Sequence, residues 1–575
     1  MKRLLAAGIL LVVFFGVSTG PASGHAVLEG SSPPRGAELK RAPSQVNFTF
    51  NEPVEASLGA VRVFDTDGNQ VQEDGIERPG GSSEAVGASL PSGLPDGLYT
   101  ATYQVVSGDS HPISGGITFT IGNPENGGSA FVQGKTISEL LAQNESGPVT
   151  EVAFWAARWV GYLAISLAIG SLIWMLSVWG PSRREDESGD QHVFQRFRKT
   201  MLWVSVAGLL ATVAAIFFQG AIGAGTSFWG AFGSGIPNEV IHTRYGTVML
   251  VRAGAWAALV GLLLLGGNRF SRIGAVSVTG LALAGLLAVT PALAGHASSR
   301  DPSWLMVPSD FVHVAAMAAW AGGLAAMLWL LPAGTSQLGS RAERTRLLTN
   351  ASLRFSTITL VAVALVAVSG TIQAIIDVGS VPALFDTQFG RAVSIKIVLF
   401  AVLIGLGAAN RRRIIPGLVK RLERAQSPGE PGNRLKRTLR IEVFLVAVVL
   451  AVSAALVSYP PPDAIQAGPA SGSVIVEGKQ VEYTVDPARV GSNEVHLYVF
   501  DGKTGAPVPV RGMEISFSLP EADIAPIEVE ARRAGPGHFV VPGAMLGVRG
   551  EWLGSAAIRL SRFEEPLAEF EFEIK

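Results

Sequence analysis

Residues 152–179 read VAFWAARWVGYLAISLAIGSLIWMLSVW, an apolar run in which Arg158 is the one charged side chain. A helix of about 20 such residues spans the hydrocarbon core of a bilayer. Seven further stretches are long and apolar enough to do the same, near residues 200–223, 245–267, 273–294, 309–331, 355–377, 391–410 and 440–459. The sequence therefore predicts a bundle of eight transmembrane helices within residues 151–460.

Positive charge is distributed unevenly over the loops between these spans. Three alternate loops each contain a single basic residue, whereas the remaining loops together contain 21 Lys and Arg, at 180–199, 268–272, 332–354 and 410–440. Basic loops remain in the cytoplasm, so both soluble ends of the chain are expected outside. We predict a multi-pass protein of the cell (inner or plasma) membrane with extracytoplasmic N- and C-terminal domains.

The composition excludes several classes of protein. Of 575 residues, 48% are hydrophobic and 16% are charged, against about 25% charged in ordinary soluble domains, so a single soluble enzyme is excluded. The net charge is −1 and no Walker motif is present, so neither nucleic acid nor nucleotide is an expected partner. Cysteine is absent, so any metal must be held by His, Met, carboxylate or amine groups.

The first 24 residues have the pattern of a cleaved signal peptide. Lys2 and Arg3 precede an apolar stretch, and small residues end the segment at Gly24. Cleavage would make His25 the first residue of the mature chain, with a free α-amine beside its imidazole. Such an amine has a reference pKa of about 7.7–8.0 and is readily deprotonated for metal binding. The alternative is an uncleaved anchor in which His25 is an ordinary loop residue.

Residues 25–122 alternate in the manner of short strands separated by turns. Candidate strands cover 46–50, 60–64, 98–103 and 116–121, which favours a small all-β Greek-key sandwich or barrel. Asp109 and His111 lie two residues apart and can point to one side of a strand edge. With the amine and imidazole of His25 they form a nitrogen–oxygen donor set that suits Cu(II). A solvated turn is the alternative for the Asp–His pair alone.

Three motifs in this stretch resemble the copper resistance protein C (CopC) family: HAVL at 25–28 with SSP at 31–33, FNEPV at 50–54, and DSHP at 109–112. The resemblance implies a Cu(II) site formed by His25, Asp109 and His111. Glu52 matches a nearby acidic residue that is expected to support the ligands without binding the metal. Some relatives also hold Cu(I) in a Met-rich loop, but residues 25–122 contain no Met. We therefore expect Cu(II) alone, with Zn(II) as the chemical alternative.

The membrane region places polar side chains near its outer face, where they are costly and therefore candidates for function. His242 lies in an outer loop, His296 at the outer end of the fourth span, and Asp310 and His313 at the start of the fifth. Met317 follows His313 by one helical turn, and an imidazole beside a thioether suits Cu(I). These residues predict a copper path, with capping of helix ends and core packing as the alternatives.

Two segments of the bundle repeat a local pattern. A glycine opens the third span at Gly246 and the seventh at Gly390, and a basic residue, Arg252 or Lys396, follows each glycine six residues later. The repeat suggests two parallel four-helix halves, with chance similarity as the alternative.

These motifs, together with D-x-x-H at 310–313, WAGG at 320–323 and NRR at 410–412, resemble in their order the copper resistance protein D (CopD) family. The resemblance spans residues 153–459 and implies movement of copper inward across the membrane.

Linkers at 123–150 and 461–472 separate the bundle from the two soluble regions. Residues 473–575 contain candidate strands at 473–476, 494–500 and 513–517, which predicts a second β-sandwich. This region resembles the YtkA-like domain of YcnJ-type copper importers, in which CopC and CopD are fused. His496 and His538 fall in strands with no evident partner, so we expect a structural role for both.

The combined pattern favours a copper-binding membrane protein, not an enzyme, that captures Cu(II) outside the membrane and imports it. The expected partners are the copper ion, the lipid bilayer and, as further candidates, extracytoplasmic copper chaperones. One alternative is an extracytoplasmic copper sequestration or resistance protein without transport. Another is a copper oxidative enzyme, because an N-terminal His with a second His also forms a histidine brace; the carboxylate of Asp109 and the membrane core argue against it.

Overall fold

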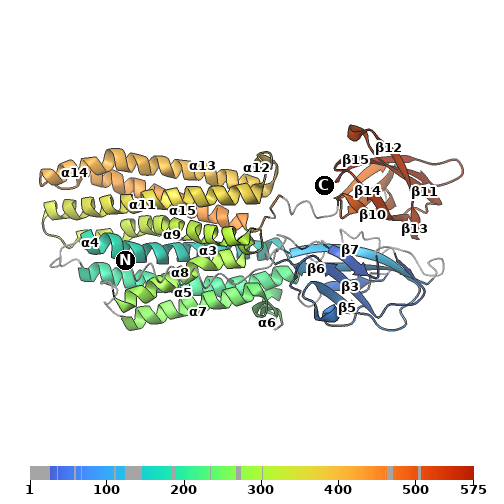
Figure 1. Ribbon diagram of the computed structural model, residues 1–575, viewed down its shortest axis with the longest axis horizontal. Helices are drawn as coiled ribbons and strands as arrows, with labels where there is room; N and C mark the ends of the chain where they lie inside the picture. Colours follow the sequence, from blue (N-terminus) through green and yellow to red (C-terminus); the bar gives the residue numbers. More distant parts are fainter. Residues whose placement is uncertain are drawn as a thin grey trace.

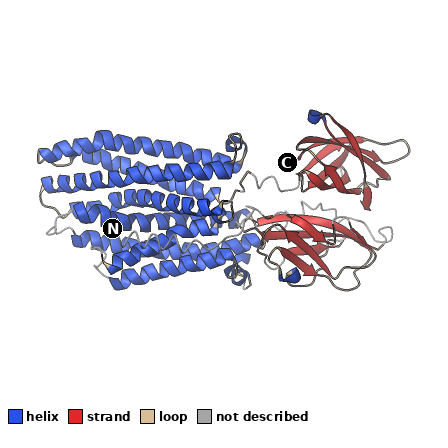
Figure 2. Cartoon of the chain, viewed as in Figure 1, coloured by secondary structure: helices blue, strands red, loops and turns tan. Residues whose placement is uncertain are grey.

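The computed structural model describes residues 26, 28–34, 37–56, 60–65, 68–108, 112–122, 146–182, 190–233, 235–266, 274–300, 302–459, 461–462, 470–502, 507–535 and 537–574. Within them the chain forms an elongated helical bundle with two β-domains side by side at one of its ends (Figures 1 and 2). The predicted fold class is confirmed: an N-terminal β-domain, eight apolar helices and a C-terminal β-domain. The predicted signal peptide at 1–24 and most of the predicted linker at 123–150 lie outside the described residues.

Alternating apolar residues build the N-terminal β-domain as two packed sheets, with strand orders β1-β3-β5 and β2-β7-β6-β4. Phe48, Phe50 and Phe119 are at most 1% exposed and fill the space between the sheets. The strands are β1 (Leu28–Ser32), β2 (Ala37–Leu39), β3 (Gln45–Phe50), β4 (Val61–Phe64), β5 (Ala85–Ser89), β6 (Gly97–Val106) and β7 (Pro112–Ile121). Strands β3, β4, β6 and β7 correspond to the four expected from alternation. The other three are short or contain glycine, so their sequences carry too little alternation to be recognised.

The eight predicted spans are confirmed, because eight helical stretches are long and apolar enough to cross a membrane. The long helices are α3 (Pro148–Trp174), α5 (Asp190–Gly223), α7 (Arg244–Gly266), α8 (Ala275–Ala294), α9 (Ser303–Trp329), α11 (Arg341–Val378), α13 (Gln388–Ala409) and α15 (Gly429–Leu456). The shorter helices are α4 (Gly180–Ser182), α6 (Ile236–Ile241), α10 (Leu331–Thr335), α12 (Ala383–Asp386) and α14 (Ile415–Glu423). Helices α5 and α11 begin well before the apolar stretches at 200 and 355, because polar turns continue each helix beyond its apolar part.

The pattern shared by the third and seventh spans has a structural counterpart. A short helix, α6 or α12, precedes each long helix, α7 or α13. The nitrogen of Gly246 donates to the hydroxyl of Thr243 at 3.0 Å, and the nitrogen of Gly390 donates to the hydroxyl of Thr387 at 2.9 Å. A Cβ on either glycine would overlap a backbone carbonyl of the preceding short helix. Glycine is therefore required at both positions for the close turn.

The C-terminal β-domain also consists of two sheets, with strand orders β13-β14-β10-β9-β8 and β12-β11-β15-β16. Its strands are β8 (Ala470–Val476), β9 (Lys479–Asp486), β10 (Gly491–Asp501), β11 (Gly512–Leu519), β12 (Ile524–Glu530), β13 (Arg532–Gly535), β14 (His538–Leu546), β15 (Gly550–Arg559) and β16 (Leu567–Ile574). Phe517, Trp552 and Phe570 are at most 2% exposed and form its core. The three predicted strands correspond to β8, β10 and β11.

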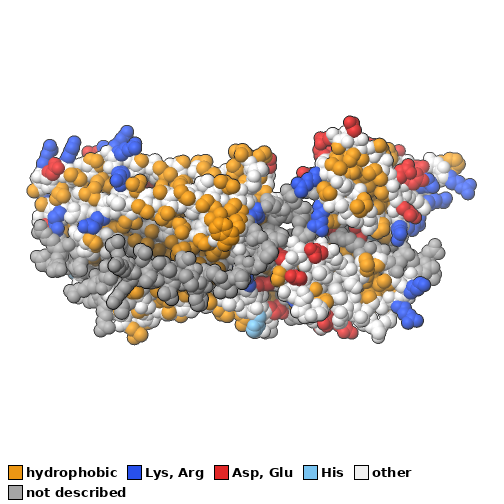
Figure 3. All heavy atoms as spheres, viewed as in Figure 1, with side chains coloured by type: hydrophobic (Ala, Val, Ile, Leu, Met, Phe, Trp, Pro, Cys, Tyr) orange, Lys and Arg blue, Asp and Glu red, His pale blue; other side chains and the backbone are white. Residues whose placement is uncertain are grey.

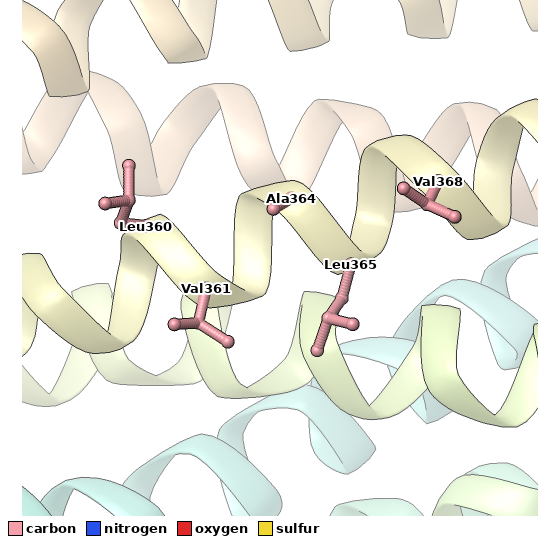
Figure 4. A pocket seen from close by; sticks show the side chains of 5 residues that line it. All are labelled: Leu360, Val361, Ala364, Leu365 and Val368. Carbon is pink, nitrogen blue, oxygen red and sulfur yellow. The ribbon is translucent and has the colours of Figure 1, made fainter.

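Apolar side chains cover much of the visible surface of the bundle (Figure 3). One shallow groove on α11 is lined by side chains of a single helix face, none of them polar: Leu360, Val361, Ala364, Leu365 and Val368 (Figure 4). A ligand pocket combines apolar walls with a few polar groups. We therefore interpret this groove as lipid-contacting surface.

Candidate metal site

The three predicted Cu(II) ligands, His25, Asp109 and His111, lie outside the described residues. Their chain neighbours are described. Ala26 follows His25, and Gly108 precedes Asp109 at the end of the segment that leaves β6. The geometry of the candidate site is therefore built from the residues that hold these two segments.

A buried carboxylate joins the two ligand-bearing segments. Glu52 follows β3 and is 4% exposed. The Ser107 hydroxyl donates to Glu52 Oε1 at 2.5 Å, and the Gly108 nitrogen donates to the same oxygen at 3.4 Å. The Ala26 nitrogen, which belongs to the peptide bond formed by His25, donates to Ser107 Oγ at 3.2 Å. The chain positions next to His25 and next to Asp109 thus meet at one hydrogen-bonded knot, which we call the Glu52–Ser107 knot.

The knot lies against the bundle. The Arg244 guanidinium, at the start of α7, donates to Gly108 O at 3.4 Å and to Leu293 O, near the end of α8, at 3.1 Å. The Arg244 backbone nitrogen donates to Glu55 Oε1 at 2.8 Å. Burial raises the pKa of the Glu55 carboxyl, and the hydrogen bonds from Arg244 and Thr243 partly offset that rise. The loop that leads to Asp109 therefore rests on the ends of two transmembrane helices.

A second contact fixes the same face of the β-domain. The Gln104 side chain on β6 donates to Ile222 O at the end of α5 at 3.3 Å. A Cβ on Gly223 would lie 3.1 Å from the side chain of Val106. The base of the N-terminal β-domain is therefore seated on the ends of α5, α7 and α8.

The two outer histidines of the predicted copper path lie at this end of the bundle. His242 follows α6 and is exposed. His296 follows α8 in a short 3-10 turn, η5 (His296–Ser298), and its ring meets that of Phe389 edge-on at 6.3 Å between centroids. Both histidines therefore lie close in sequence to the ends of α7 and α8, which Arg244 links to the Glu52–Ser107 knot.

The deeper residues of the predicted path, Asp310, His313 and Met317, all lie on α9. His313 Nδ1 lies 3.0 Å from Ser369 Oγ on α11. The Lys396 ammonium on α13 lies within electrostatic range of Asp310. Met317 is 8% exposed and packs in the hydrophobic core of the bundle. Among the described residues, no group of three or more His, Asp or Glu side chains is arranged to hold a metal ion. The copper path therefore stays a prediction, carried by separate polar positions.

The expectation that His496 and His538 have no partner is wrong. The register of β10 against β14 sets Tyr498 opposite His538, and His496 Nδ1 lies 3.0 Å from His538 Nε2. His496 Nε2 lies 2.6 Å from Glu494 Oε1. Sequence reasoning missed this cluster because its two histidines are 42 residues apart; the alternation of Glu494, His496 and Tyr498 along β10 is the signal that could have indicated a shared polar face.

Comparisons with known proteins cover most of the chain. A CopC domain model matches residues 28–122, a copper resistance protein D-like N-terminal domain model matches 149–304, and a copper resistance protein D model matches 349–456. The chain is similar to the copper transport protein CutJ of Bacillus subtilis, with 30% identity over 505 residues, 87% of this chain and 86% of that protein. It is 26% identical to copper resistance protein D of Pseudomonas syringae over 312 residues, 53% of this chain and 96% of that protein.

Among solved structures, CopC from Methylosinus trichosporium matches at 24% identity and a TM-score of 0.16, covering 18% of this chain and 97% of that one. The match to CutJ, which extends over most of both chains at 30% identity, decides the assignment. The chain belongs to the family of the copper transport protein CutJ, and it joins a CopC domain to a membrane region of the copper resistance protein D type.

Proposed function

We propose that this protein is a copper carrier that captures Cu(II) outside the membrane and passes it inward through the bundle. In this proposal His25, Asp109 and His111 bind the ion. The polar positions His242, His296, Asp310 and His313, with Met317, form the acceptor path. The protein binds and transfers its cargo and catalyses no covalent reaction.

This proposal rests on one observation, which is the contact between the Glu52–Ser107 knot and the helix bundle. Arg244 hydrogen-bonds both to Gly108, next to the predicted ligand Asp109, and to Leu293, three residues before His296. A donor that is held next to its acceptor transfers its ion at high effective concentration, so free copper is not required. A copper-sequestering domain that is only anchored to the membrane would not need this contact with the bundle.

The donor chemistry supports a change of oxidation state between the two parts. Imidazole, amine and carboxylate donors suit Cu(II), whereas a thioether near an imidazole suits Cu(I). The N-terminal domain has no Met, while Met317 lies one turn from His313. We propose that copper binds as Cu(II) in the β-domain and moves as Cu(I) through the bundle, with the electron supplied by an external reductant.

The orientation of the chain is part of the same proposal. Both β-domains lie at one end of the bundle, and Lys and Arg side chains gather at the opposite end, near α14 (Figures 1 and 3). Basic residues favour the cytoplasmic side, so this arrangement supports β-domains outside the membrane. The names of the relatives, a copper transport protein and a copper resistance protein, agree with copper as the cargo.

Copper accumulation by intact cells tests the proposal. Cells that express the wild type are compared with cells that express the double variant His25→Ala, His111→Ala, and N-terminal sequencing establishes whether the mature chain starts at His25. We expect faster accumulation of isotopic copper with the wild type and loss of that gain in the variant. Equal accumulation, combined with copper bound by the purified wild type, would contradict import and support sequestration.

A further inference from the structure

A buried polar array lies where the two β-domains meet. The Thr118 hydroxyl on β7 donates to Glu494 Oε1 on β10 at 3.3 Å, and the same oxygen contacts His496, which in turn contacts His538. Thr118 is 2% exposed, and Glu494, His496 and His538 are each 1% exposed. Strands β7 and β10 face each other in Figure 1. The array therefore connects the CopC domain to the C-terminal β-domain.

A second contact joins the C-terminal β-domain to the strand that follows the predicted copper ligand His25. The Arg489 guanidinium donates to Leu28 O, at the start of β1, at 3.2 Å. Arg489 belongs to a turn that Asn493 stabilises, because the Asn493 amide donates to Arg489 O at 2.8 Å and accepts from Arg489 N at 3.1 Å. Leu28 lies three residues after His25. We call the segment that runs from His25 to Leu28 the copper-binding arm, and Arg489 contacts its last residue.

We propose that the C-terminal β-domain is a proton-sensitive clamp on the copper-binding arm. The clamp docks through the Glu494–His496–His538 array and through Arg489, and it opens when the His496–His538 pair becomes fully protonated. The part that concerns copper rests on the function proposed above, whereas the docking part is independent of it.

The hydrogen bonds explain why protons control the clamp. The contact between His496 Nδ1 and His538 Nε2 needs one donor and one acceptor nitrogen, and a fully protonated pair offers only donors. Burial and the neighbouring His496 imidazole hold the pKa of His538 well below its usual value. The docked form therefore holds fewer protons than the open form, so docking weakens as the pH falls below the ordinary histidine pKa of about 6.5.

The other charged groups at this interface do not offset that effect. On the C-terminal side, Glu494 already accepts from His496, and Asp486 and Glu482 on β9 are paired by register with Glu494 and Tyr498. Arg532 on β13 is paired with Val540, the residue opposite His496 on β14.

On the N-terminal side, the β6 and β7 face presents Thr100, Thr102 and Thr118, all at most 6% exposed. Arg62 on β4 is paired with Thr102. Together with burial, the His496 imidazole is the one among these groups that lowers the pKa of His538.

The distance between the two β-domains tests the clamp directly in the full-length protein in lipid nanodiscs. The chain has no Cys, so Glu73→Cys and Glu528→Cys, both at exposed positions, introduce two unique sites for spin labels. Pulsed electron paramagnetic resonance then measures the distance distribution at about pH 8 and about pH 5.5. One unit below the histidine pKa, we expect the docking equilibrium constant to fall by up to about tenfold.

The variant His538→Gln tests whether protonation of the histidine pair causes the clamp to open. Its amide can still contact His496 Nδ1 but does not ionise, so the distance distribution should stay short at both pH values. Glu569→Gln, at an exposed position on β16, serves as the matched control and should behave as the wild type. A wild-type distribution that is the same at both pH values would overturn the clamp, and so would an equal loss of docking in His538→Gln.

Copper release tests the effect of the clamp on the arm. At about pH 8, Arg489→Ala should release Cu(II) to a chelator several-fold faster than the wild type, whereas Arg562→Ala, at an exposed position outside this contact, should not. Equal release rates would refute the role of the clamp at the arm. If the wild type binds no copper, the proposed function fails while the distance measurement still decides the docking.

Discussion

Each β-domain contains a carboxylate that is less than 5% exposed, Glu52 in one and Glu494 in the other, and the two have different tasks. Glu52 is 4% exposed and accepts hydrogen bonds from Ser107 and Gly108 within its own domain. Glu494 is 1% exposed and contacts His496 in its own domain and Thr118 in the other. Glu52 therefore organises one loop, whereas Glu494 joins two domains.

The comparison shows how the surroundings decide the role of a buried acidic residue. An unpaired buried carboxylate is costly, so each of these side chains constrains whatever satisfies it. At Glu52 the constrained partners are backbone and hydroxyl groups beside predicted metal ligands. At Glu494 the partners are the His496 imidazole and the Thr118 hydroxyl of the other domain, so this carboxylate links a histidine pair to the contact between the domains.

The largest expected effect is a loss of Cu(II) affinity in Glu52→Ala, without any change in the docking of the two β-domains. Glu52→Ala removes the acceptor that holds Ser107 and Gly108, and loss of such a supporting group typically lowers metal affinity by about 10–100-fold. Competition with a chelator measures the Cu(II) affinity. The spin-label distance between the β-domains should be unchanged, and a normal affinity in this variant would remove Glu52 from the site.

Glu494→Ala should give the opposite result. His496 and Thr118 lose their shared acceptor, at a cost of about 1–2 kcal/mol or roughly 5–30-fold in docking. The same spin labels at about pH 8 should report a larger open population, while Cu(II) affinity changes little compared with Glu52→Ala. If Glu494→Ala lowered copper affinity as strongly as Glu52→Ala, the two carboxylates would not have separate tasks.

The smallest effect is expected at Ser107. Ser107→Ala removes the hydroxyl between Ala26 N and Glu52 but leaves the bond from Gly108, so the loss should be about 1 kcal/mol, roughly fivefold in Cu(II) affinity. The same chelator competition measures it, with Ser83→Ala, on an exposed turn of the same domain, as the control. A loss equal to that of Glu52→Ala would mean that the hydroxyl alone carries the knot.

The sequence was sufficient for the architecture but not for the contacts between distant segments. The eight spans could be predicted because apolar length is a local property, and β3 and β7 could be predicted because alternation is also local. The pairing of Glu52 with Ser107 joins residues 55 positions apart, and no local pattern encodes it; Glu52 was expected only from the family resemblance.

The same limit explains the error at His496 and His538. Their contact depends on the register of β10 against β14, which a short-range pattern does not specify. The contact of Arg244 with Gly108 depends in turn on how a β-domain sits on a helix bundle. Long-range packing, rather than local propensity, sets all three contacts.

The central claim is that the N-terminal β-domain delivers copper to the bundle through its seat at Arg244. The most direct test is isotopic copper accumulation in cells that express Arg244→Ala, measured beside the Cu(II) affinity of the purified variant. Arg391→Ala is the control, because Arg391 lies near the start of α13 and, among the described residues, its guanidinium donates to Phe385 O and Asp386 O of the adjacent short helix and to no group of the β-domains. We predict wild-type affinity with several-fold slower accumulation for Arg244→Ala and no change for Arg391→Ala. Wild-type accumulation by a correctly inserted Arg244→Ala protein would contradict the claim.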